Sequence, residues 1–157
     1  MTRSAALVTL ALTLPAQAAP RFIGPWFVDV TLNTATETTS LTAGQNTTAM
    51  GITLTCFDRH LTLGVWKPGS GLRLVVPSKA LVSVQVDAQD PIIVKGYATA
   101  PNLAEFYTNV EPIMRQMLAG ERVAVTLTDG DGNTRSENFP LANTAQAFSG
   151  LTRYCPL

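Results

Sequence analysis

The chain closes with the stretch Phe139-Pro-Leu-Ala-Asn-Thr-Ala-Gln-Ala-Phe-Ser-Gly-Leu-Thr-Arg-Tyr-Cys-Pro-Leu157, and this stretch decides the fold. It begins extended and then changes to a helical period. Steps of four, three, three and four place five apolar residues on one helical face: Leu141, Ala145, Phe148, Leu151 and Cys155. Asn143 is the expected N-cap, and Pro156 ends the helix. The pattern predicts a C-terminal helix near 143–154 that packs on the rest of the protein.

The chain has two cysteines, Cys56 and Cys155, and they predict one disulfide in an exported protein. This bond would join the C-terminal helix to an early strand. Closing a loop of roughly 100 residues would stabilise the fold by about 4–5 kcal/mol. Two free thiols or a redox site are the alternatives, and the chain has no Cys-x-x-Cys motif to support the second.

The first eighteen residues have the pattern of a secretory signal peptide. Arg3 supplies a positive start, an apolar run covers 5–14, and Ala16-Gln17-Ala18 has the form of a signal-peptidase site. We expect cleavage after Ala18, which leaves 19–157 as one β-rich domain; a buried N-terminal helix is the alternative. No cysteine follows the site, and no later segment is long and apolar enough to span a bilayer. The predicted location is periplasmic or secreted, with no stable membrane anchor after cleavage.

Charge is sparse and balanced, with 11 basic and 11 acidic residues and 14% charged residues in all. Such a chain offers neither the basic surface that nucleic acid requires nor a polybasic membrane anchor. A protein partner, of a kind that the sequence does not identify, remains as the expected class. Nothing in the sequence indicates a cofactor.

Short alternating runs joined by Gly and Pro turns predict an antiparallel β-sandwich or open barrel. In the run 26–32, Trp26, Val28, Val30 and Leu32 share one face. The segment 31–55 is rich in Thr, which favours strands, and we expect a turn at 43–46 to divide it. Further strands are expected where apolar residues alternate: 52–56, 61–65, 72–76, 82–86, 92–97, 123–127 and 134–141. Both tryptophans, Trp26 and Trp66, are expected in the core or at its edge.

A helical period interrupts the strands near 102–119. Asn102 with Glu105 three residues later resembles a capping box, and Gly120 is a natural terminator. Pro112 lies inside this pattern, so either the helix kinks there or a second helix begins with Pro112. The fold class is therefore mainly β with two helical segments.

Catalytic candidates are few. His60 is the single histidine and Asp58 lies two residues before it, so a hydrolase would need both beside a nucleophile such as Ser70. The segment 69–71 is better explained as a turn, and the chain has no Gly-x-Ser-x-Gly motif. One histidine and two distant cysteines do not make a zinc site. We find no catalytic constellation.

Asp129, Asp131 and Asn133 match the first three ligand positions of a calcium loop. Thr134 stands where the loop needs glycine, and Pro140 stands where it needs a bidentate Glu. A tight hairpin turn is the main interpretation, and these three residues are weak metal candidates.

The chain resembles the periplasmic, type VI secretion-associated VasI family. The residues that carry the likeness are Trp26, Val28, Leu54, Cys56, Phe139, Leu141, Ala147, Phe148, Leu151 and Cys155. The resemblance implies the β-rich fold and the disulfide more than a role in secretion. It implies no catalytic residues.

Composition, motifs and resemblance lead to one main functional hypothesis: an exported, non-enzymatic accessory or binding protein of the cell envelope that acts through protein–protein contacts. A small secreted hydrolase or hydrolase inhibitor is the first alternative. A structural envelope protein that turns a Thr-rich β face outward is the second.

Overall fold

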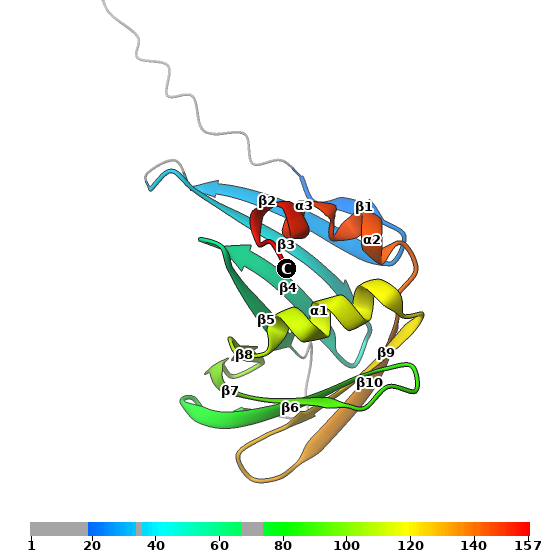
Figure 1. Ribbon diagram of the computed structural model, residues 1–157. Coiled ribbons are helices and arrows are strands. Elements are labelled where there is room, and N and C mark those ends of the chain that lie inside the picture. The colour runs from blue at the N-terminus through cyan, green and yellow to red at the C-terminus, as the bar shows by residue number, and fades with distance from the viewer. Residues whose placement is uncertain (1–18, 34–35, 67–73) are drawn as a thin grey trace, which may run out of the picture.

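The computed structural model describes residues 19–33, 36–66 and 74–157. Ten strands account for most of them (Figure 1). The strands are β1 (Arg21–Ile23), β2 (Trp26–Asn33), β3 (Thr38–Asn46), β4 (Gly51–Phe57), β5 (His60–Trp66), β6 (Ser78–Val86), β7 (Ile92–Ala100), β8 (Leu103–Phe106), β9 (Arg122–Thr128) and β10 (Thr134–Pro140). The helices are α1 (Val110–Ala119), α2 (Thr144–Ala147) and α3 (Ser149–Tyr154). The predicted class, mainly β with helical segments, is confirmed.

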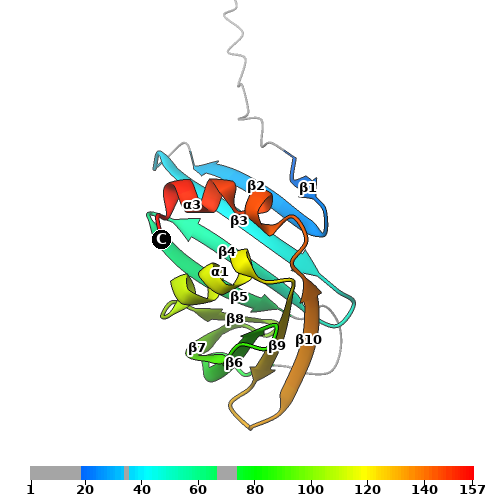
Figure 2. The same cartoon turned by 45° about the vertical axis from the view of Figure 1, so that its right-hand side comes forward.

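All ten strands belong to one antiparallel sheet with the order β1-β2-β3-β4-β5-β8-β7-β6-β9-β10. The meander β1–β5 is followed by a second meander, β6–β8, whose last strand pairs with β5. Strand β9 then returns beside β6 and carries β10 with it. The sheet curves so that the two meanders lie above and below helix α1, while α2 and α3 lie against the meander β1–β5 (Figures 1 and 2). This arrangement is consistent with the predicted sandwich or open barrel.

The inner face of the sheet, which is the face toward the helices, follows the predicted alternation. On β4, β6 and β9 every second residue is buried: Ile52, Leu54 and Cys56; Val82, Val84 and Val86; Val123, Val125 and Leu127. A shift of one residue in any of these strands would turn its apolar set to solvent, so burial fixes the register. The buried apolar residues form one core.

The predicted helix near 102–119 is wrong in its first part, because Leu103–Phe106 is strand β8. Ala104 and Phe106 face the core while Leu103 and Glu105 face outward, and the segment pairs with strands on both sides. Helix α1 begins at Val110, so Pro112 lies in its first turn, where a missing N–H breaks no helical hydrogen bond. The helix therefore needs no kink at Pro112.

The C-terminal segment forms two short helices, α2 and α3, where one helix was predicted for 143–154. Asn143 has a left-handed backbone (φ 61°) and makes no side-chain cap. The inward residues of α2 are Thr144 and Ala147, whereas Ala145 of the predicted apolar face is exposed. The hydroxyl of Thr144 donates to the Leu141 carbonyl at 2.6 Å, which satisfies the one polar group on this inward face.

Two strand predictions in the first half need correction. The expected turn at 43–46 lies inside β3, and the chain turns at 47–50, where the Thr47 hydroxyl accepts hydrogen bonds from the backbone N–H groups of Ala49 and Met50. On β2, Trp26 is buried but Val30 and Leu32 are exposed, because the helices do not cover that end of the strand.

The strand predicted at 72–76 is also wrong in its described part. Residues 74–77 are not in a strand, although Leu74 is buried. Leu72, the turn at 68–71 and the predicted signal peptide 1–18 lie outside the described residues.

Candidate functional site

The outer face of the sheet, which is the side away from the helices, carries a group of exposed side chains on β6 and β7. The register places Lys79 opposite Tyr97 and Leu81 opposite Lys95, and Ile93 lies two residues further along β7. The exposed fractions are 38% for Leu81, 62% for Ile93 and 57% for Tyr97. We name these five residues, Lys79, Leu81, Ile93, Lys95 and Tyr97, the outer-face cluster.

Strand alternation is the physical cause of this cluster. Ala80 and Val82 of β6 and Val94 of β7 point into the core, so their sequence neighbours must point outward. The inner residues lock the register, and the outer residues are thereby held on a rigid surface. Leu81, Ile93 and Tyr97 do not belong to the core and need another explanation.

A hollow of about 630 Å³ lies over four of the five cluster residues, and Ile93 lies outside its lining. Lys79, Leu81, Lys95 and Tyr97 line it, and its wall includes Thr108, which follows β8, together with Asp129 and Gly130 of the β9–β10 turn. The hollow therefore combines an apolar floor with two ammonium groups and one carboxylate at its border.

The two lysines of the cluster form no salt bridge within the described residues. In the described part of the chain the one salt bridge joins Arg115 to Glu111 on α1, and neither lysine takes part in it. Lys79 and Lys95 are also the two described lysines of a chain with three. The residues that line the hollow therefore include two lysines and one aspartate, Asp129, which gives the lining a formal net charge of +1 (2 − 1).

The carboxylate in the wall, that of Asp129, is already engaged within its own turn. Its Oδ1 accepts from the backbone N–H groups of Asp131 (3.0 Å) and Asn133 (2.8 Å), and its Oδ2 accepts from Asn133 Nδ2 (2.9 Å). Slight burial acts to raise the pKa of Asp129, but the hydrogen bonds from Asn133 and from the turn backbone outweigh it and lower the pKa. The structure therefore brings Asp129, Asp131 and Asn133 together as a hairpin turn. Among the described residues no group of three His, Cys, Asp or Glu side chains is placed to hold a metal ion.

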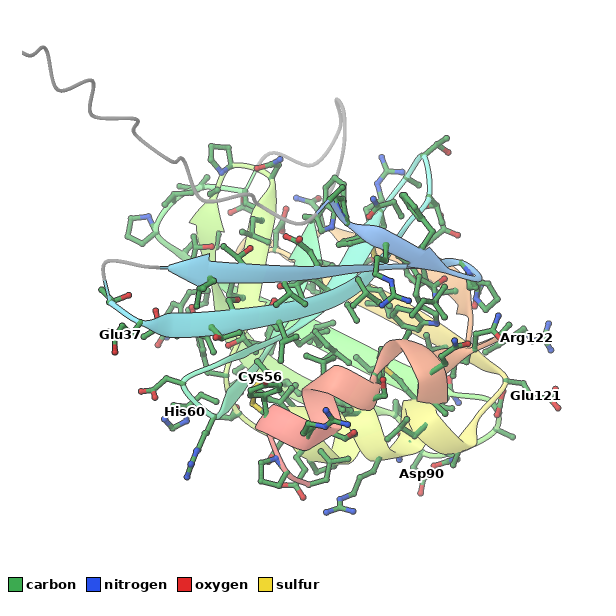
Figure 3. The ribbon with its side chains drawn as sticks, turned by 90° about the horizontal axis from the view of Figure 1, so that it is seen from above. Glu37, Cys56, His60, Asp90, Glu121 and Arg122 are labelled. Atoms are coloured by element: carbon green, nitrogen blue, oxygen red, sulfur yellow. A yellow bond between two sulfur atoms is a disulfide. The ribbon has the colours of Figure 1, made fainter. Side chains whose placement is uncertain are left out.

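His60 lies on the open β4–β5 hairpin, next to Asp58 and Arg59, which both have positive φ. The imidazole is exposed and points outward at the same end of the molecule as Glu37 (Figure 3). No hydrogen bond joins it to Asp58 within the described ranges, and Ser70 lies outside them. This geometry does not support the His60–Asp58 hydrolase hypothesis.

A second hollow, of about 560 Å³, lies beside His60 and the start of α1. Arg59, His60 and Tyr107 line it together with residues 109–112. The Tyr107 hydroxyl donates to Glu105 Oε2 at 3.0 Å; burial, this hydrogen bond and the glutamate charge raise the pKa of Tyr107. Pro112 removes one of the free N–H groups from this helix start, and Glu111 in the lining is paired with Arg115 at 2.8 Å.

The predicted disulfide is confirmed. Cys56 of β4 and Cys155 at the end of α3 are joined by an S–S bond of 2.01 Å, and both residues are buried. Figure 3 shows Cys56 beneath α3. At Phe148, between α2 and α3, the aromatic ring packs edge to face against the Trp26 ring of β2, with 4.7 Å between the ring centroids. These contacts fasten the C-terminal helices to the sheet, which is a structural role.

The Thr-rich stretch contributes to the outer face of β2–β5. Thr42, Thr55 and Thr62 lie in one register row, and the hydroxyls of Thr42 and Thr55 are 3.1 Å apart and hydrogen-bonded. Trp66 is half-buried on the same side, where its ring covers Gly51. Two of the three hydroxyls in this row therefore form a hydrogen bond with each other.

The chain matches no protein-family model, no curated protein and no solved structure. None of the helices in the described ranges is long and apolar enough to cross a membrane.

Proposed function

We propose that this chain is an exported, non-enzymatic accessory or binding protein of the cell envelope, and that it binds a protein partner through the outer-face cluster. The observation that carries the proposal is the exposure of Leu81, Ile93 and Tyr97 between two lysines without salt bridges. Exposed apolar side chains gathered on a rigid surface and bordered by polar groups are typical of protein interaction sites.

Export is part of the proposal and has two supports. The first is the signal-peptide pattern of residues 1–18. The second is the disulfide, since structural disulfides form and persist in oxidising compartments such as the periplasm or the exterior. The resemblance to the VasI family agrees with an envelope role and stays a prediction.

The chemistry of the cluster indicates what the partner surface carries. Tyr97 offers a large ring with few rotatable bonds, which is a common interface anchor. The lysines favour carboxylates on the partner and would speed association at low salt. We therefore expect a partner with an apolar contact flanked by Asp or Glu.

The test is crosslinking in the envelope fraction with tagged wild-type protein and with the double variant Ile93→Ser/Tyr97→Ser. The wild type should recover a partner that the double variant recovers at least about tenfold less, since losing anchor residues costs more than 1 kcal/mol each. Phe57→Ser is the matched control, because Phe57 is also half-exposed but lies at the far end of β4.

Thermal melting of all three proteins checks that the variants remain folded. Equal recovery by the wild type and the folded double variant would overturn the assignment of this surface. An absence of any partner above background for the wild type would overturn the binding function itself.

A further inference from the structure

One edge of the sheet is left uncovered. Strand β1 has three residues and pairs with Trp26, Phe27 and Val28 of β2, whereas β2 continues to Asn33. From Asp29 onward, no strand in the described part of the chain pairs with this side of β2.

The unpaired backbone groups can be identified from the register. The hairpin between β1 and β2 has a two-residue turn, so the closing pair, Ile23 and Trp26, exchanges backbone hydrogen bonds. Every second residue of β2 then points its N–H and C=O to this edge, which selects Val28, Val30 and Leu32. On this edge Val28 has a partner in Arg21, but Val30 and Leu32 have no strand partner there among the described residues.

The same two residues expose their side chains on the inner face. Val30 is 45% exposed and Leu32 is 59% exposed, although Trp26 on the same face of β2 is fully buried. Helix α3 approaches Leu41, the β3 neighbour of Val30, through Gly150, and does not extend over Val30 itself. Val30 and Leu32 therefore carry both backbone groups without a strand partner on this edge and exposed apolar side chains.

The opposite edge of the sheet is protected in the usual way. Strand β10 carries Arg135 and Glu137 and ends in Pro140, and charges and proline discourage edge-to-edge pairing. The segment Val30-Thr31-Leu32 has neither a charge nor a proline. This part of the β2 edge lacks the residues that discourage pairing at the β10 edge, so it is suited to pairing with another strand.

We propose that a second copy of this chain pairs with the β2 edge in antiparallel orientation, with Thr31 opposite Thr31 of the other copy. This register places Val30 opposite Leu32 and Leu32 opposite Val30, so each pair exchanges both of its free hydrogen bonds. The side chains of both pairs meet on the inner face. The flanking Asp29 of each copy lies opposite position 33 of the other copy, so the two like charges are not opposed. The sequence is thus complementary to itself about Thr31, as a two-fold interface requires.

The pairing is short, so we expect a dimer that depends on protein concentration. Unlike the proposed partner site, it uses the edge of β2 and not the outer face of β6 and β7. The two inferences can therefore fail separately.

Site-directed crosslinking tests the register. In an antiparallel sheet the residues of a non-hydrogen-bonded pair have Cα atoms about 4.5 Å apart, which is within the range that a disulfide spans. The variant Thr31→Cys in the exported chain should form a reducible dimer under mild oxidation. The control Ile93→Cys, at an exposed site on β7, should form at least about fivefold less.

A second variant, Val30→Pro, tests the hydrogen bonds. Proline is accepted on an edge strand whose N–H faces solvent, so the monomer should stay folded. Sedimentation should show a dimer fraction that rises with concentration for the wild type and stays near zero for Val30→Pro.

Three results would overturn the proposal. They are a wild type that remains monomeric up to millimolar concentration, a dimer whose Thr31→Cys crosslinking does not exceed that of Ile93→Cys, and a folded Val30→Pro variant that dimerises as the wild type does. If Val30→Pro fails to fold, the comparison of crosslinking between Thr31→Cys and Ile93→Cys tests the proposal by itself. If Thr31→Cys crosslinks only when another envelope protein is added, the strand that pairs with β2 belongs to that protein and not to a second copy of this chain.

Discussion

Removing the Cys56–Cys155 bond should strongly lower the stability of this protein. The bond joins residues 99 positions apart, so it closes most of the domain into one loop. For a loop of about 100 residues, the unfolded-state entropy model gives about 4.7 kcal/mol at 25 °C. Both cysteines are 2% exposed, so Cys56→Ala/Cys155→Ala also leaves a small cavity that costs about 1 kcal/mol more.

We expect the free energy of unfolding of the double variant to fall by about 4–6 kcal/mol, out of the 5–15 kcal/mol that is usual for a domain. The native fold should survive if the wild type begins in the upper part of that range, because Phe148 still packs against Trp26. Guanidinium titration followed by tryptophan fluorescence is the assay, since Trp26 is buried in the native state. The m-value should rise, because the unlinked unfolded chain exposes more surface.

Wild-type protein unfolded under a reducing agent supplies the control, and it should match the double variant within about 1 kcal/mol. If the double variant loses less than about 1 kcal/mol and keeps the wild-type m-value, the loop-entropy argument is wrong for this chain. The helices would then be held by packing alone.

Two further changes test smaller parts of the structure. Gln45 is buried and its Nε2 donates to the Pro140 carbonyl at 2.7 Å, so Gln45→Leu should cost about 1–2 kcal/mol in urea unfolding, whereas the exposed Gln85→Leu should cost close to nothing. Equal losses would show that this link between β3 and β10 adds no stability. Because folding lowers the pKa of Asp129, its charged form stabilises the protein above the unfolded-state pKa, and this contribution is lost as the pH falls through the folded-state pKa. Asp129→Asn should therefore flatten the acid limb of a stability–pH profile more than Asp131→Asn does; identical profiles would contradict the role of the turn hydrogen bonds.

The sequence predicted those parts of the fold in which local pattern and burial agree. The alternation in β4, β6 and β9 gives the inner face directly, and two cysteines allow a single intramolecular pairing. The segment 103–106 was predicted as helix because Leu103, Phe106 and Val110 also fit a helical period. Pairing with β5 and β7 decides in favour of a strand, and no local signal reports a non-local pairing.

The outer-face cluster was missed for a related reason. Leu81, Ile93 and Tyr97 alternate with buried residues, so β6 and β7 carry apolar side chains on both faces. Such a pattern is typical of a strand buried on both sides, and only the arrangement of layers shows that one side is open. The signal available in the sequence was the presence of Lys79 and Lys95 in phase with these residues.

The two proposed surfaces are connected through the geometry of the sheet. Opposed residues of an antiparallel pair point their side chains to the same face, so pairing along β2 would continue the sheet of one copy into that of the other. Each copy of the dimer would carry one outer-face cluster on its own β6 and β7, so the dimer would carry two. A partner with repeated binding sites would bind it more tightly than it binds a monomer, because the second contact is intramolecular. The crosslinked Thr31→Cys dimer and the Val30→Pro monomer should therefore differ in retention on a multivalent partner surface and agree in affinity for a single soluble partner domain.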